Sequence, residues 1–133
     1  ARAGFDLMTR EMRNAGYDPR GTAAAGVTAW SPEAFGWTAD LDADGTADGD
    51  GERVEYRLAE DGTLLRREDE VDVAVAEDVT ELRFDYFADA DETPATSAGE
   101  IALVAVRLAY DTPRGVATAT LETRVALRNR LWR

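Results

Sequence analysis

The stretch RVEYRLAEDGTLLRRE (residues 53–68) carries the strongest secondary-structure signal in this sequence. Its first half places Val54, Tyr56 and Leu58 at every second position, with charged residues between them. Strict alternation of this kind is typical of a β-strand with one buried face. Residues 60–63 then supply a glycine, which tolerates the positive φ of a tight turn. The stretch therefore predicts a β-hairpin in which residues 64–68 pair back onto the first strand.

Alternation or continuous apolar character recurs on both sides of this hairpin. It predicts further strands at residues 27–30, 35–41, 82–86, 101–110 and 116–127. Residues 71–79 give an ambiguous pattern, which we interpret as a short irregular crossing. The chain beyond residue 27 is therefore expected to be β-rich.

The N-terminal residues follow a different period. Phe5, Met8 and Met12 fall on one stripe at helical spacing, and arginines occupy the opposite face. This pattern predicts an amphipathic helix over residues 1–15, which Gly16 ends. No Ser, Thr, Asp or Asn cap precedes the helix, so we expect it to continue from an apolar segment encoded upstream.

One helix followed by strands predicts an α+β fold, with the N-terminal amphipathic helix packed on an antiparallel β-sheet. The 133 residues, 44% of them hydrophobic, are enough for one domain with its own core. We expect a single domain over residues 1–133, with the helix in residues 1–15 and the β-rich region in 27–133. No apolar run approaches the roughly 20 residues of a membrane-spanning helix.

Charge and composition exclude several classes of function. Fifteen Lys+Arg against 27 Asp+Glu give a formal charge of −12, which disfavours binding to a nucleic-acid backbone. The chain has no cysteine and no histidine. Disulfides, thiol nucleophiles, cysteine- or histidine-bound metals and Ser-His-Asp chemistry are therefore absent.

An acidic run, DLDADGTADGDGE (residues 40–52), is the one motif that points to site chemistry. Calcium loops place oxygen ligands at alternating positions and a glycine at the sixth. Asp40, Asp42 and Asp44 occupy the first, third and fifth positions, and Gly45 the sixth. The twelfth position, where a bidentate Glu is usual, is Gly51. Because strands and not helices are expected on both sides, an EF-hand is excluded, whereas a calcium loop on a hairpin is not.

Two interpretations of this run stay open. One is a weak calcium site, with affinity in the extracellular range. The other is a solvated Asp- and Gly-rich turn, although five aspartates so close together repel one another unless something neutralises them. The candidate ligands are Asp40, Asp42, Asp44, Thr46 through its carbonyl, Asp48, Asp50 and Glu52.

Catalysis is not expected. Paired carboxylates that act on glycosides lie on rigid elements beside a cleft, whereas the acids here gather in a loop or alternate on strands. Four aromatic residues at strand positions could stack on a sugar, but such residues more often belong to a core; they are Trp30, Trp37, Tyr56 and Tyr86.

The segment LMTREMRNAGYDP (residues 7–19) resembles the PilW-type minor pilins of type IV pili. In that family, a similar Arg-Glu-Met/Ile-Arg-Asn-Ala-Gly-Tyr-Asp-Pro stretch ends the long N-terminal helix. Shorter similarities follow in the same order, at residues 38–41, 52–56, 75–79 and 127–130. The resemblance covers nearly the whole chain, and its first block is the distinctive one.

The resemblance implies a pilin-like fold and a structural role without enzymatic activity. It implies a prepilin anchored in the inner membrane, with its domain in the periplasm and later in the surface pilus. The implied partners are other minor pilins and the major pilin, in a complex that primes assembly and sits at the fibre tip. These proteins are similar to the J-type pseudopilin of type II secretion, which is one alternative. A calcium-dependent adhesin or carbohydrate-binding domain is an alternative of another class.

Two helix residues are candidates for the partner surface. Leu7 and Glu11 flank the stripe of Phe5 and Met8, about 100° or more around the helix. We expect the domain's own sheet not to reach both, so that they face the helix of a neighbouring pilin. A tolerated surface leucine explains Leu7 equally well.

Overall fold

The computed structural model describes residues 1–133 except 21, 24, 50, 113–116 and 128–133. Strands dominate this part of the chain, and none of its helices is long and apolar enough to cross a membrane. The elements are the helix α1 (Arg2–Met12), β1 (Val27–Ser31), β2 (Ala34–Thr38), β3 (Arg53–Leu58), β4 (Leu64–Glu68), β5 (Val71–Ala76), β6 (Val79–Phe87), the 3-10 helix η1 (Ala98–Glu100), β7 (Leu103–Asp111) and β8 (Thr118–Ala126).

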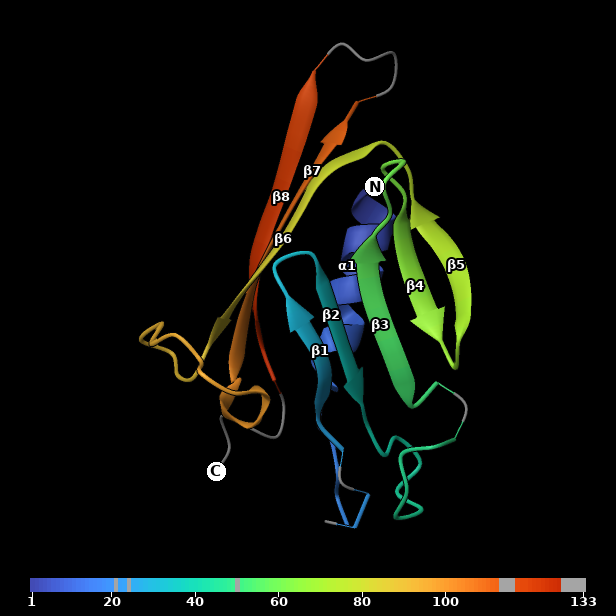
Figure 1. The fold of residues 1–133 in the computed structure, drawn as a ribbon, viewed down its shortest axis with the longest axis vertical. Helices are drawn as coiled ribbons and strands as arrows, with labels where there is room; N and C mark the ends of the chain where they lie inside the picture. Colours follow the sequence, from blue (N-terminus) through green and yellow to red (C-terminus); the bar gives the residue numbers. More distant parts are fainter. Residues whose placement is uncertain (21, 24, 50, 113–116, 128–133) are drawn as a thin grey trace.

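The first five strands form one antiparallel sheet in chain order, with β5 at its outer edge (Figure 1). The predicted hairpin at residues 53–68 is confirmed: β3 and β4 pair from Val54 and Glu68 to Leu58 and Leu64. Gly62 takes the positive φ that the turn requires, 86°. The strongest local signal in the sequence therefore lies within this sheet.

The ambiguous segment 71–79 contains a regular strand, so the prediction of an irregular crossing is wrong for β5. Asp69 and Glu70 form the turn between β4 and β5, with φ values of 49° and 73°. Positive φ at both central residues is the geometry of a type I′ hairpin turn, whose backbone twist matches the right-handed twist of the paired strands. The sequence conceals this turn because it carries two acids where Asn-Gly or Asp-Gly is the usual signal.

The last three strands form a second antiparallel sheet, in the order β6, β7, β8. The chain leaves the first sheet at Asp78, whose φ is 57°. The Val79 amide then donates to the Gly62 carbonyl at 2.9 Å, and the Phe84 amide donates to the Pro32 carbonyl at 2.8 Å. These bonds hold β6 against two turns of the first sheet.

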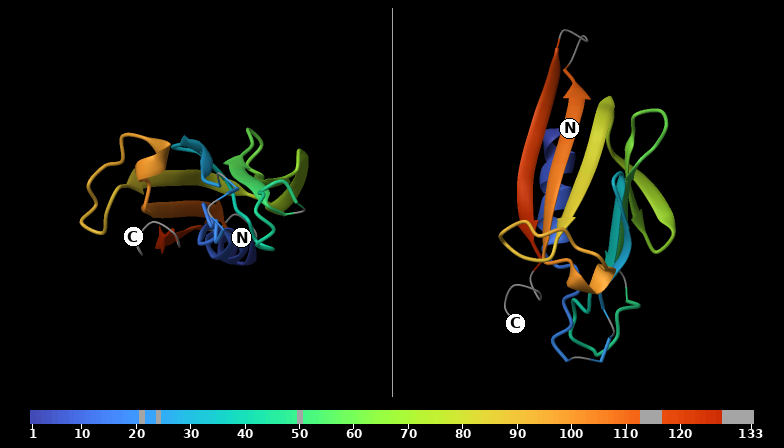
Figure 2. Two further views of the ribbon diagram at one scale, coloured as in Figure 1. Left: turned by 90° about the horizontal axis from the view of Figure 1, so that it is seen from below. Right: turned by 60° about the vertical axis from the view of Figure 1, so that its left-hand side comes forward.

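Helix α1 contributes to the same core. The stripe of Phe5, Met8 and Met12 is buried, as predicted, together with side chains of both sheets. The helix contacts β5 and β8, and Figure 2 shows it alongside the long strands of the second sheet. At Gly4 the approach is closest, because an added Cβ would lie 2.6 Å from the Val75 carbonyl oxygen. A larger residue at this position would force the helix away from β5.

The predicted α+β, pilin-like fold class is wrong. The described residues form mostly antiparallel β-structure in two sheets, with one short N-terminal α-helix of 11 residues. Two local features explain the difference. The helix ends at Met12, ahead of the left-handed Gly16 (φ 77°), and the positive φ of Asp78 divides the strands into two sheets. The alternation that predicted strands could not reveal that division.

Candidate metal centre

The acidic run forms the connection between β2 and β3, at the lower end of the molecule in Figure 1. Backbone hydrogen bonds fix its two ends. The Ala39 amide donates to the Glu52 carbonyl at 2.9 Å, and the Asp40 amide donates to the Tyr17 carbonyl at 2.7 Å. Strands flank the loop, which confirms that it is not an EF-hand.

Asp40 organises the first half of the loop from a fully buried position, with 0% of the residue exposed. Its Oδ1 accepts the Asp44 amide at 3.1 Å, and its Oδ2 accepts the Gly45 amide at 2.9 Å. Gly45 has a φ of 91°, which aims its amide back at the carboxylate without strain. The glycine expected at the sixth position therefore has a defined structural role.

Glu52 organises the second half and is only 2% exposed. Its Oε2 accepts the amides of Leu41 at 2.6 Å and Asp42 at 3.4 Å, and its Oε1 accepts the Gly49 amide at 2.8 Å. Two buried carboxylates are thus held by backbone N–H groups. These donors satisfy hydrogen bonding but carry no net positive charge, so the negative charge of the loop remains.

Asp42 and Asp44 join these two residues at the surface. One carboxylate oxygen from each of Asp40, Asp42, Asp44 and Glu52 lies within 4.8 Å of the others, and this cluster can hold a metal ion. Desolvation, followed by repulsion from Asp44 and Glu52, raises the pKa of Asp42 above its ordinary value. The amide and hydroxyl of Thr46 lower the pKa of Asp44. A group of carboxylates is the donor set that hard divalent cations prefer.

Of the other predicted ligands, Thr46 contacts a member of this cluster. Thr46 donates its amide and hydroxyl to Asp44 Oδ1, each at 2.9 Å. Asp48 is exposed and is not among the clustered acids. Asp50 lies outside the described residues. All four clustered acids were thus among the candidates from the sequence. Glu52 joins the three aspartates from the position after the usual twelfth, because the start of β3 carries it back to Asp40.

The segment before β1 lies beside the loop. Arg20 Nη1 donates to the Ala43 carbonyl at 3.5 Å, and the Thr22 hydroxyl donates to the Gly45 carbonyl at 2.8 Å. Both bonds go to backbone oxygens, so the clustered carboxylates keep their charge. No ion pair joins an arginine to any of the four acids within the described residues.

Of the two candidate interface residues, Glu11 is reached by the domain's own sheet. Arg66 of β4 donates Nε to Glu11 Oε1 at 2.8 Å and Nη2 to Oε2 at 2.7 Å. The Tyr56 hydroxyl donates to the same carboxylate. Glu11 therefore fastens the helix to β3 and β4, a junction that the sequence analysis missed because its partners lie more than forty residues away. Leu7 is half-buried, and its place in a partner surface stays a prediction.

The four aromatic residues divide into core and surface. Trp37 and Tyr56 are buried, in line with the expectation of a core, and their rings stack at 6.0 Å. Tyr86 is half-buried and donates its hydroxyl to the Ser31 and Ala34 carbonyls. Trp30 is exposed and lies beside Tyr86. The two rings meet edge to face, with their centroids 5.6 Å apart. Only Trp30 and Tyr86 are therefore placed where a ligand could stack.

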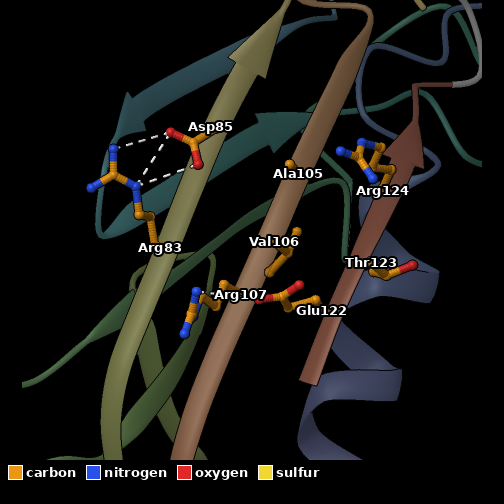
Figure 3. Close-up of a pocket in the computed structure, with 8 residues that line it drawn as sticks. All are labelled: Arg83, Asp85, Ala105, Val106, Arg107, Glu122, Thr123 and Arg124. Atoms are coloured by element: carbon orange, nitrogen blue, oxygen red, sulfur yellow. Dashed lines mark hydrogen bonds and ion pairs between the residues drawn. The ribbon is translucent and has the colours of Figure 1, made fainter. Parts of the chain in front are cut away.

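A second polar surface covers the outer face of β6, β7 and β8, where a shallow hollow of about 430 Å³ opens (Figure 3). Each arginine that lines it is already paired. Arg83 meets Asp85 at 3.2 Å, and Arg124 meets Glu92 at 2.6 Å. Arg107 lies between Glu81 at 2.9 Å and Glu122 at 3.3 Å. This surface is a network of exposed ion pairs and offers no uncompensated cation to an anionic ligand.

Comparison of the chain with protein-family models, with curated proteins and with solved structures finds no match.

Proposed function

We propose that this protein is a non-enzymatic structural subunit, the globular domain of a PilW-type minor pilin. The observation that carries the proposal is the position of residues 7–19, the block that resembles that family. The helix ends within this block at Met12, and Gly16, with a φ of 77°, donates its amide to the Thr38 carbonyl at 3.0 Å. Tyr17 accepts the Asp40 amide. The block thus connects the helix, the sheet and the acidic loop. Because this connecting segment is also the one that resembles the PilW-type family, it supports the proposed role.

The helix has the two faces that a subunit of a fibre needs. Its inner face is buried, and Glu11 holds it to the sheet. Its outer face carries exposed Arg2, Asp6 and Arg10. In the proposed role, Leu7, at the border of this outer face, contacts other minor pilins or the major pilin. An apolar segment upstream would anchor the protein in the inner membrane, with the domain in the periplasm before assembly and on the surface pilus afterwards.

Calcium is the ion that we propose for the acidic cluster. Calcium takes several oxygen ligands in flexible geometry, and a loop held by backbone hydrogen bonds can adjust to it. Asp40 and Glu52 each keep lone pairs beyond those used by the amides, while Asp42 and Asp44 face solvent. Desolvation and repulsion raise the pKa of Asp42, and bound calcium would relieve the repulsion.

The role in pilus assembly is tested by deleting the gene in its source bacterium and counting surface pili. We expect pili to be lost or reduced at least tenfold and to return with the wild-type gene. The tagged full-length protein should co-purify with pilins. Normal piliation of the deletion strain, together with absence of pilins from the purified protein, would contradict the proposal. Loss of type II secretion instead of pili would favour the pseudopilin alternative.

The partner surface is tested by Leu7→Arg, with Asp6→Arg as the matched control on the neighbouring, exposed helix position. Both changes introduce one arginine into the same helix. We expect both variants to fold, because neither residue belongs to the buried stripe. Only Leu7→Arg should lower co-purification with pilins and the number of pili. Equal piliation by the two variants would remove Leu7 from the interface.

A calcium-dependent carbohydrate-binding role is the second candidate, favoured by one observation. Exposed Trp30 and its neighbour Tyr86 border a hollow of about 270 Å³ that Arg83 and Asp85 also line. An exposed aromatic beside polar groups is a usual sugar-binding arrangement. A glycan array would show a signal that disappears with EDTA and with Trp30→Ala. An array without signal in calcium would eliminate this candidate.

A further inference from the structure

Strand β5 carries the two most exposed large apolar side chains in the described part of the chain. Val71 is 63% exposed and Val73 is 52% exposed, more than any other large apolar residue there. Strand β5 ends the five-stranded sheet, and Figure 1 shows it at the margin of the molecule. No described strand pairs with its outer side. An edge of this kind is a template for another strand.

The register of the neighbouring hairpin shows how the β4 backbone is oriented. The Ala59 amide donates to the Thr63 carbonyl, and the Asp69 amide donates to the Arg53 carbonyl. Both pairs continue the register of β3 with β4. Because hydrogen-bonded pairs alternate in antiparallel sheets, the odd-numbered residues of β4 direct their backbone groups to β3. The even-numbered residues direct theirs to β5.

The orientation of β5 follows from this alternation. Its residues opposite the even-numbered positions of β4 are Val71 and Val73, and they bond inward. Asp72 and Ala74 therefore turn their N–H and C=O groups away from the sheet. These four backbone groups are the donors and acceptors that an added strand requires, and the two exposed valines lie beside them.

Acids stand at both ends of this edge. Asp69 and Glu70 precede β5, and Glu77 and Asp78 follow it. All four are exposed, and none forms a side-chain hydrogen bond or ion pair in the described structure. Asp72, in contrast, is already bound by Arg57 at 2.9 Å. The uncompensated charge is thus at the ends of the strand.

This charge disfavours a second copy of the protein as the occupant. Antiparallel pairing of two β5 edges would set residues 69–70 of each copy against 77–78 of the other. Parallel pairing would set each acidic pair against its own counterpart. Both arrangements bring like charges together in a chain whose net charge is −12.

We propose that the β5 edge binds an extended segment of another protein as a sixth strand of the sheet. The segment carries β-branched residues at alternate positions and Lys or Arg at both ends. Its backbone bonds Asp72 and Ala74, its apolar residues cover the exposed valines, and its basic ends meet the flanking acids. This inference stands independently of the proposed pilus function.

The test uses the full chain and a fluorescent, end-blocked peptide of sequence RRTVTVRR, measured by fluorescence anisotropy. The control peptide EETVTVEE has the same centre and opposite ends. We expect saturable binding of the basic peptide at least tenfold tighter than the acidic one, weakened by salt because charged groups contribute. Equal affinity of the two peptides, or absence of binding, would overturn the proposal and leave the acids as protection against edge pairing.

Two variants separate strand addition from general charge attraction. Ala74→Pro removes one outward N–H and no bond to β4, a position where an edge strand tolerates proline. It should weaken peptide binding at least tenfold while circular dichroism stays unchanged. Glu70→Gln with Glu77→Gln should weaken binding and reduce its salt dependence. The matched control, Glu33→Gln with Glu60→Gln, removes the same charge from exposed positions elsewhere and should bind as the wild type.

Three results would overturn the proposal. Unchanged binding by Ala74→Pro would mean that the peptide does not add to the edge. Equal weakening by both glutamine pairs would mean that only the total charge matters. Self-association of the wild type in sedimentation, abolished by Ala74→Pro, would make a second copy the occupant.

Discussion

The acidic loop holds buried carboxylates and the helix junction a half-buried one, and the two regions compensate them in opposite ways. In the loop, backbone amides bind Asp40 and Glu52. In the junction, Arg66 binds Glu11 through two parallel bonds. A backbone amide donates a hydrogen bond to a carboxylate but leaves its negative charge uncompensated. A guanidinium donates hydrogen bonds and also compensates that charge. The loop therefore keeps an attraction for cations that the junction has lost.

The largest effect is expected from Arg66→Met, which breaks the junction. This change leaves Glu11 without its cation, and removal of one partner from this half-buried pair costs about 2.5 kcal/mol, less than the roughly 3–5 kcal/mol of a fully buried pair. Urea unfolding should show this loss, whereas Arg67→Met on the opposite face of β4 should cost under about 0.5 kcal/mol. Adding Glu11→Gln to Arg66→Met removes the unpaired charge but keeps an acceptor for the Tyr56 hydroxyl, and should restore most of the stability. Equal stability of the two single variants would show that the pair does not hold the helix.

The next effect is expected from Asp40→Asn, which breaks the loop. The amide group of asparagine would place a donor against the Gly45 N–H or the Asp44 N–H, at a cost of about 2 kcal/mol. Asp48→Asn, outside the cluster, should stay within about 0.5 kcal/mol of the wild type. Chemical denaturation measures both. An Asp40→Asn variant with the same free energy of unfolding as the wild type would mean that the buried carboxylate does not organise the loop.

A pH titration distinguishes the two regions further. Burial, together with Glu11, raises the pKa of the Tyr56 hydroxyl, and burial raises that of Tyr86. Above about pH 10 the unfolded tyrosines ionise while the folded ones stay neutral, so the free energy of unfolding falls as pH rises. Each contributes up to about 1.4 kcal/mol per pH unit. Tyr56→Phe should reduce the slope of the free energy of unfolding against pH, and Asp40→Asn should leave that slope unchanged. An unchanged slope in Tyr56→Phe would contradict the raised pKa.

The smallest effect concerns calcium. Binding in the weak, millimolar-to-submillimolar range would stabilise the folded protein by about 1 kcal/mol at a few millimolar calcium. The melting temperature of the wild type should rise in calcium relative to EDTA, whereas that of Asp42→Ala should not. Arg66→Met should keep the calcium response, because the junction contributes nothing to the site. Superimposable wild-type curves in calcium and EDTA would leave only a solvated turn.

Local sequence predicted the features that local chemistry controls. Alternation located the hairpin at residues 53–68, and helical spacing identified Phe5, Met8 and Met12 as core. The positions of Asp40, Asp42 and Asp44 identified three members of the acidic cluster. Each of these inferences needed only residues within a few positions of one another, since turns, strand faces and helix faces repeat over short distances.

Features that join distant segments were missed for the opposite reason. The bond from Glu11 to Arg66 spans 55 positions, and helical spacing alone does not show which side chain of a sheet meets the helix. The same limit applies to β5, whose turn of Asp69 and Glu70 gives no turn signal. The expected fold class was therefore wrong, although most of its strands were correctly placed.

The sequence by itself determined the helix stripe, the alternating strands, the acidic run and a composition without cysteine or histidine. Only the tertiary structure decided that the strands form two sheets, that Glu52 and not Asp48 joins the three aspartates of the acidic cluster, and that Glu11 faces inward. It also left the two valines of β5 exposed. The physical reason is that periodicity fixes which face of an element is apolar, whereas strand order and register fix which faces meet.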